Sequence, residues 1–71
     1  MPYFIHIITR RPYMLLGHAK CAKTAKDMVL YKQLFDSTER ETGEYLPKGT
    51  MWTRDAKEWN ERFVKVHRDQ M

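Results

Sequence analysis

A tryptophan, an arginine and a second tryptophan lie close together in the chain, as Trp52, Arg54 and Trp59. Side chains two residues apart point to the same face of a strand, so the guanidinium of Arg54 can lie beside or over the indole of Trp52. Such a pair offers an aromatic surface for stacking together with a bidentate contact to an anion. These contacts suit a ligand that carries a base and a phosphate.

The role of this pair depends on the face to which it points, and the sequence leaves two orientations open. If the pair points outward, Trp52 and Arg54 form a binding surface. If it points inward, Trp52 belongs to the hydrophobic core, and Arg54 extends past it to pair with an acid such as Asp55 or Glu58.

Residues that could carry other chemistry are few. His6 lies in an otherwise apolar run, where a histidine is either satisfied in the core or faces a pocket as a donor. His18 and Cys21 could begin a metal site, but a closed zinc site needs four ligands and only two further histidines exist. Cys21 would need a base such as His18 to act as a nucleophile. We expect no metal, no cofactor and no enzymatic activity.

The net charge of +4 is unevenly distributed. Residues 1–35 contain six lysines and arginines and one acid, whereas residues 36–45 contain four acids and one arginine. A basic half beside an acidic segment could steer an anionic partner toward one face. A solvated surface whose charges serve solubility explains the same pattern, and the sequence does not separate the two interpretations.

The length of 71 residues predicts a single domain over residues 1–71 with a small core. A core of this size gives only marginal stability, which favours association with a partner or with a second copy of the chain. No apolar run is long enough to cross a bilayer, and the start lacks the features of a signal peptide. A single cysteine agrees with a reducing compartment. We therefore expect a cytoplasmic protein without membrane contact.

The first elements are predicted from the alternation of apolar residues. Residues 3–9 are nearly apolar on both faces, which predicts a central, well-buried strand. Pro12 ends this strand because it lacks the N–H that a ladder needs. Residues 13–20 form a second strand, with Gly17 at a bulge or close approach, and the two strands form a hairpin.

The middle of the chain is ambiguous. Apolar residues over 22–35 fall at helical spacing, and propensity favours a helix over residues 22–26, but residues 28–31 are also a compact strand signal. Residues 36–49 are polar and charged with glycine and proline between them, which predicts a long connecting loop or an irregular hairpin.

The last part of the chain is predicted to contain one short helix. Residues 50–54 fit a short strand and residues 55–62 a helical turn or two. Asp55 is placed to cap the helix, and Glu58 to complete a capping box. A last strand contains Phe63, Val64 and Val66, and residues 68–71 are expected to fray.

An ordered series of motifs carries a resemblance to a known family. The chain resembles a family of small bacterial and phage domains of unknown function, numbered sixteen fifty-three among such families. That family's pattern runs Y-x-H-(Y/F)-K-G, Y-x-V-x-G-x-A-(R/K), a later L-V-V-Y, and L-W-V-R-P followed by an aromatic residue. The resemblance covers residues 4–63 and is carried by Phe4, Ile5, His6, Gly17, Ala19, Tyr31, Trp52, Arg54 and Trp59.

The chain departs from this family at three points. A longer connection through Arg11 replaces the K-G turn, Asp55 stands where the family has proline, and residues 36–49 look like an insertion. The resemblance implies a mainly β fold, a small SH3-like antiparallel barrel with one short helical segment near the C-terminus. It also favours a strand over residues 26–35. It implies no activity.

The barrel that the resemblance implies would place further side chains beside the tryptophan–arginine pair. The predicted ligand-binding residues are His6, Lys20, Tyr31, Trp52 and Arg54. We interpret the chain as a non-enzymatic binding module that holds a nucleotide or nucleic acid on a basic, aromatic face. The alternative is a protein-interaction module, for instance a small phage-type inhibitor or accessory factor, since the core is marginal and five methionines can form an adaptable surface.

Overall fold

The strands follow the β-branched and aromatic runs of the sequence. The structure is a computed structural model that describes residues 2–66, so the predicted frayed tail at residues 68–71 lies outside the described residues. The protein is mainly β with one short helix near the C-terminus, as predicted. Its elements are β1 (Tyr3–His6), β2 (Pro12–Lys20), β3 (Asp27–Gln33), β4 (Ser37–Thr38), β5 (Tyr45–Leu46), β6 (Met51–Asp55), α1 (Ala56–Arg62) and β7 (Phe63–Val66).

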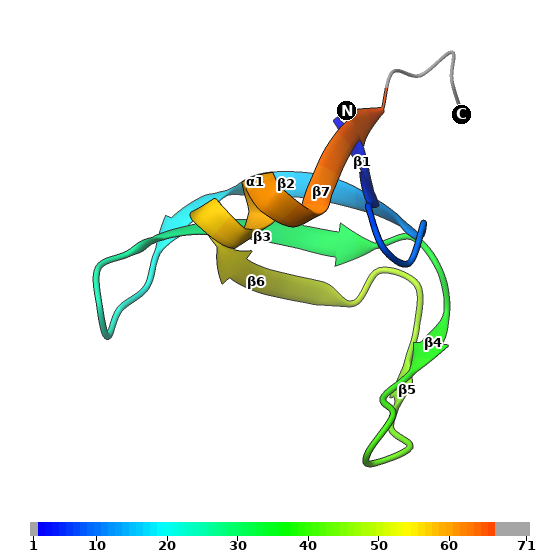
Figure 1. The fold of residues 1–71 in the computed structure, drawn as a ribbon. Coiled ribbons are helices and arrows are strands. Elements are labelled where there is room, and N and C mark those ends of the chain that lie inside the picture. Colours follow the sequence, from blue (N-terminus) through cyan, green and yellow to red (C-terminus); the bar gives the residue numbers. More distant parts are fainter. Residues whose placement is uncertain (1, 67–71) are drawn as a thin grey trace.

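Five of the strands form one antiparallel sheet in the order β6-β3-β2-β1-β7. The chain forms a meander through β1, β2, β3 and β6, and the last strand, β7, returns to pair with β1. In Figure 1, β1 and β7 rise steeply from the level of β2, β3 and β6, so the sheet is strongly bent. The edge strands β6 and β7 do not pair with each other, and the barrel is therefore open.

A bulge in β2 accompanies this bend. The register between β2 and β3 shifts between Leu15 and Gly17, so Leu16 is the extra residue. A bulge bends a strand and increases its local twist, so the sheet can curve sharply at this point. The predicted irregularity at Gly17 is confirmed.

The first strand is shorter and less buried than predicted. β1 ends at His6, and the backbone N–H of Arg10 donates to the carbonyl of His6 at 2.8 Å to form a turn. Arg10 adopts a left-handed conformation there, with φ of 62°. The side chain of Ile8 is 73% exposed. The apolar alternation thus continues past the end of the strand, and the prediction of a well-buried strand over residues 3–9 was wrong in both length and burial.

The ambiguity over residues 22–35 is settled in favour of a strand, β3. Residues 22–26 form a turn instead of the helix that propensity favours. The N–H of Ala25 donates to the carbonyl of Cys21 at 2.7 Å, and Ala25 has φ of 60°. A left-handed residue cannot continue a right-handed helix, so the turn delivers the chain directly into β3.

The helix α1 begins at its predicted cap. The carboxylate of Asp55 accepts the backbone N–H of Lys57 at 2.9 Å. The predicted capping box is incomplete, because the Glu58 carboxylate lies 3.6 Å from the guanidinium of Arg54 instead. A helix of seven residues is unstable alone. Trp59, on its buried side, attaches it to the sheet.

The hydrophobic core lies between the inner face of the bent sheet and α1. Its buried members are Val29, Tyr31, Trp59 and Phe63. The rings of Trp59 and Phe63 stack with centroids 4.0 Å apart and an interplanar angle of 14°. Of the two tryptophans in the chain, Trp59 is thus the core residue. No helix in the described part of the chain is long and apolar enough to span a membrane.

Residues 36–49, hereafter the arm, form an irregular hairpin and not an open loop. β4 and β5 pair antiparallel, and in Figure 1 they project away from the sheet beyond the end of β3. The carboxylate of Asp36 fixes the base of the arm by accepting the N–H of Lys48 at 2.8 Å and the hydroxyl of Tyr45 at 3.1 Å. The pKa of Asp36 is lowered, chiefly by the hydrogen bond from Lys48.

Candidate functional site

A cavity of about 490 Å³ opens between the inner face of the sheet and the arm. Strands β2, β3 and β6 supply one wall, the turn before β2 supplies a second, and the arm supplies a third. The lining residues are Thr9, Arg11, Tyr13, Tyr31, Gln33, Phe35, Ser37, Thr38, Arg40, Leu46, Trp52 and Arg54.

The charged side chains that line this pocket are three arginines, Arg11, Arg40 and Arg54, and no acid is among the lining residues. Acidic residues occur nearby in the arm, and two of them, Asp36 and Glu39, accept hydrogen bonds from the arm itself. The carboxylate of Glu39 accepts the backbone N–H groups of Glu41 and Thr42, which lowers the pKa of Glu39. The lining of the pocket thus carries three positive charges and no carboxylate, and Glu58, outside the lining, forms an ion pair with Arg54 at 3.6 Å.

Arg54 is held through its Nε atom, whereas its two terminal nitrogens form no hydrogen bond within the described residues. Nε donates to the hydroxyl of Tyr31 at 3.2 Å, and the guanidinium lies 5.5 Å from the ring centroid of Phe63. Glu58 lies 3.6 Å from one terminal nitrogen, beyond hydrogen-bond distance. Within residues 2–66 the four terminal N–H groups have no hydrogen-bond partner, so they are available for a bidentate contact.

Trp52 lines the pocket, and its one polar group is already occupied. The indole N–H donates to the side-chain oxygen of Gln33 at 2.9 Å. Its side chain is 37% exposed and lies outside the core cluster. The structure thus combines the two predicted orientations of the pair. Trp52 and Arg54 point to the inner face and Arg54 reaches Glu58, yet both side chains line an open cavity.

Gln33 connects the strand wall of the pocket to the arm. It is only 2% exposed. Its side-chain nitrogen donates to the carbonyls of Phe35 at 2.9 Å, Leu46 at 2.8 Å and Pro47 at 3.4 Å. A buried amide with its donors and acceptor all satisfied is rigid, because any rotation would leave a polar atom unpaired. Gln33 therefore sets the position of both walls.

The opposite wall carries a second arginine on an aromatic ring. The guanidinium of Arg11 lies 4.8 Å from the ring centroid of Phe35. Phe35 in turn packs edge-on against Tyr13, with centroids 5.3 Å apart. Arg40, from the exposed part of the arm, supplies the third positive charge. Guanidinium groups that lie on rings keep their edges available for anions.

The structure places His6 beside the core and not in the pocket. Its ring packs edge-on against Phe63, with centroids 5.0 Å apart, and its Nδ1 accepts the backbone N–H of Thr9 at 3.3 Å. Partial burial lowers the pKa of His6, and the positive charges of Arg54 and Arg62 lower it further. These contacts agree with the interpretation of His6 as a satisfied histidine at the edge of the core.

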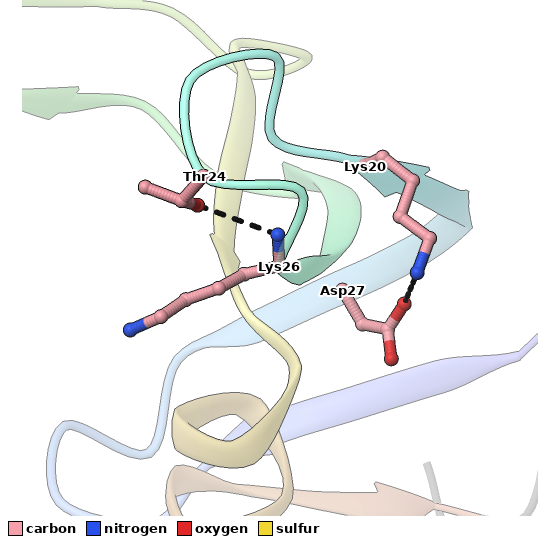
Figure 2. A network of polar contacts seen from close by, with 4 residues as sticks. All are labelled: Lys20, Thr24, Lys26 and Asp27. Atoms are coloured by element: carbon pink, nitrogen blue, oxygen red, sulfur yellow. Dashed lines mark hydrogen bonds and ion pairs between the residues drawn. The ribbon is translucent and has the colours of Figure 1, made fainter.

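Lys20 is not a neighbour of the other predicted residues, so that part of the predicted arrangement was wrong. Figure 2 shows its ammonium paired with the carboxylate of Asp27, at 2.6 Å, where β2 and β3 join. Both side chains are largely exposed. Tyr13, the residue of β2 that lines the pocket, is seven positions away, which is roughly 20 Å along a strand.

The strands thus bring together three of the predicted residues, Tyr31, Trp52 and Arg54. Tyr31 is opposite Trp52 in the pairing of β3 with β6, and its hydroxyl holds Arg54. The sequence patterns did not identify the other two arginines of the pocket. The adjacent pair before Pro12 was a signal for Arg11, whereas no local pattern distinguishes Arg40 from other charged residues of the arm.

Metal binding finds no support among residues 2–66, in which no three His, Cys, Asp or Glu side chains gather as ligands. No family model, curated protein or solved structure matches the chain. The resemblance to the family numbered sixteen fifty-three therefore stays a prediction, and the functional proposal rests on the fold and the pocket.

Proposed function

We propose that the protein is a non-enzymatic binding module whose pocket holds a ligand with a planar ring and a phosphate, either a nucleotide or a stretch of nucleic acid. One observation carries the proposal: three arginines and no acid line a cavity to which Tyr13, Tyr31, Phe35 and Trp52 also contribute aromatic rings. Arginine matches phosphate bidentately, and aromatic faces stack on bases. A cytoplasmic location belongs to this proposal, since such ligands are abundant there.

The electrostatics of the pocket favour an anionic ligand over an apolar one. Three like charges around one cavity repel each other, and a bound phosphate relieves that repulsion. The open fork of Arg54 is already oriented by Tyr31, so little side-chain entropy is lost when it binds. Trp52 lies two residues away on the same face of β6 and can stack on the ring of the same ligand.

The experiment is a binding and stability screen. Intrinsic tryptophan fluorescence and the melting temperature are measured with a panel of nucleotides, cyclic dinucleotides and short oligonucleotides, at low and high salt. A ligand that binds only the folded state raises the melting temperature. We expect at least one member of the panel to do so, and Arg54→Ala to abolish the effect. Lys26→Ala is the matched control, because it removes one positive charge from the exposed turn before β3.

The outcome that would contradict the proposal is a panel in which no member changes fluorescence or melting temperature at low salt. An effect equally reduced by Arg54→Ala and Lys26→Ala would show that overall charge alone attracts the ligand. In that case the pocket is not the binding site.

A second candidate function, protein interaction, is favoured by an apolar area on the other side of the sheet. Val64 is 52% exposed, and it lines a hollow of about 220 Å³ together with Ile5, Ile7, Val66 and one charged residue, Arg10. Exposed apolar groups of this kind mark contact surfaces. A complex of defined stoichiometry, with a partner or a second copy, that survives high salt and Arg54→Ala but is lost in Val64→Lys would support this function.

A further inference from the structure

We infer that the ligand of the pocket is single-stranded nucleic acid, with Arg11, Arg40 and Arg54 contacting separate phosphates and Trp52 stacking on a base. This inference rests on the proposed function and narrows it to one class of ligand. The arrangement of the charges, the absence of a phosphate cradle and the occupied N–H of Trp52 each support it.

The three arginines stand on three different segments of the chain. Arg11 precedes β2 and lies on the ring of Phe35, whereas Arg54 belongs to β6 and lies on the ring of Phe63. Arg40 comes from the arm. Charges anchored on separate rings and separate walls can each contact a different phosphate. They suit a backbone that crosses the cavity and presents several phosphates in succession.

A free nucleotide with a polyphosphate tail would need a different site. Such tails are held by backbone N–H groups of a glycine-rich loop or of a helix N-terminus. None of the three glycines of the chain lines the pocket. The first turn of α1 is already capped by Asp55 and is also absent from the lining. The pocket therefore contacts phosphates through side chains and not through a loop of backbone N–H groups.

Trp52 can recognise a base only through its ring face. Its N–H is used by Gln33, so no donor remains to read a base edge. Stacking on a ring face tolerates every base, which is typical of proteins that bind single strands without sequence preference. A duplex keeps both faces of each base inside its own stack and cannot offer one to Trp52 unless the base is flipped out.

Three phosphate contacts predict a measurable dependence on salt. For a single strand, the logarithm of the binding constant falls with the logarithm of salt concentration by about 0.7 for each phosphate that is neutralised. Three contacts give a slope of about −2, which corresponds to a roughly twentyfold loss of affinity between about 50 and 200 mM salt.

The test measures fluorescence anisotropy of a labelled single-stranded oligonucleotide of mixed sequence, the matching duplex and a mononucleotide, over this range of salt. We expect the single strand to bind best with a slope of about −2, and each of Arg11→Ala, Arg40→Ala and Arg54→Ala to reduce the slope by about 0.7. Trp52→Leu should weaken binding by a constant factor at all salt concentrations. Lys26→Ala should leave the slope unchanged.

Arg54→Lys serves as a second variant, because a loss of binding in Arg54→Ala could follow from the lost contact with Tyr31. It keeps the charge, so we expect the salt slope of the unmodified protein with a lower affinity. Circular dichroism establishes that each variant is folded.

The outcomes separate this inference from the proposed function. If a mononucleotide binds as tightly as the oligonucleotide and competes with it, the inference is wrong and the proposed function stands. Equal binding of the duplex, or a slope that none of the arginine variants changes, also overturns the inference. If no ligand of either kind binds, both fail together.

Discussion

The indole N–H of Trp52 donates to the side-chain oxygen of Gln33 at 2.9 Å, across 19 residues of sequence. The same amide donates through its nitrogen to carbonyls at both ends of the arm. The orientation of the amide is thus determined on both sides, with oxygen toward the strand wall and nitrogen toward the arm. One buried side chain couples two walls of the pocket that belong to different sheets.

Gln33→Glu should break this coupling on one side only. A carboxylate can still accept from Trp52, but it would face the carbonyl oxygens of Phe35 and Leu46 without a donor. We expect the free energy of unfolding to fall by at least about 2 kcal/mol, the typical penalty for a buried polar group left unpaired. Urea unfolding measures the loss, and hydrogen exchange should become faster in the arm while β2 stays protected.

Gln33→Met is the control for this prediction. It keeps the length of the side chain and removes the amide without adding charge, so its cost should be smaller than that of Gln33→Glu. If both variants unfold at the same urea concentration as the original protein, the amide does not hold the arm.

The two tryptophans should report on different parts of the molecule. Trp59 is buried against Phe63, whereas Trp52 is partly exposed at the pocket. In Trp52→Phe, the remaining emission from Trp59 should be blue-shifted and resistant to acrylamide. In Trp59→Phe, the emission from Trp52 should be quenched more readily and should be the part that a ligand changes. A ligand response that persists in Trp52→Phe would place the binding site elsewhere.

Removal of the helix cap should cost a moderate amount of stability. The Asp55 carboxylate satisfies the N–H of Lys57 at the start of α1. Asp55→Ala should lower the free energy of unfolding by about 1 kcal/mol. Asp55→Asn retains an oxygen acceptor and should recover most of this loss. Equal destabilisation by both substitutions would show that the negative charge matters and not the cap.

The environment of His6 should make stability fall in mildly acidic solution. Because its pKa is lowered in the folded state, the unfolded chain binds more protons between that pKa and the ordinary value of about 6.5. The contribution of His6 is therefore complete above pH 6.5 and is lost as the pH falls through this window to the folded pKa. An NMR titration of the His6 ring checks the direction, and Arg54→Ala should raise its pKa by removing a like charge. A value at or above 6.5 in the unmodified protein would contradict this account.

Lys20→Ala should change neither the melting temperature nor ligand binding by a measurable amount. Lys20 and its partner Asp27 are both largely exposed, and exposed ion pairs contribute little. Thermal melts and the anisotropy titration measure both quantities. A clear loss of binding would restore Lys20 to the site and imply that the ligand extends along β2.

Local signals in the sequence predicted the elements well because each depends on near neighbours. Asp55 before a helical run identified the cap, and Gly17 identified the bulge. Residues 22–26 were misleading because propensity cannot reveal that Ala25 takes a left-handed conformation in a tight turn. Residues 28–31 gave a local strand signal, and the family resemblance decided between that strand and a helix.

The site was predicted only in part, because a pocket depends on contacts between distant segments. Tyr31 and Arg54 meet through strand register, which the order of motifs implied. The arm, which carries Arg40, is joined to the strand wall of the pocket by the side-chain amide of Gln33. No sequence pattern indicated that this polar residue is buried. Lys20 lies at the opposite end of β2 from Tyr13, so it is outside the pocket although the bounds of this strand were predicted closely.

The two ends of the arm join the sheet at neighbouring positions, so changes within the arm need not disturb the sheet. The arm leaves after β3 and returns at β6, and its two ends meet through backbone hydrogen bonds between Gly49, Thr50 and Gln33. Lys32 and Met51, just inside these ends, are paired neighbours in the sheet. The entropic cost of closing a loop grows slowly with its length, so the segment between these points can be exchanged while the sheet keeps its register. Such a chain is a scaffold on which a new arm would confer a new ligand preference without a new fold.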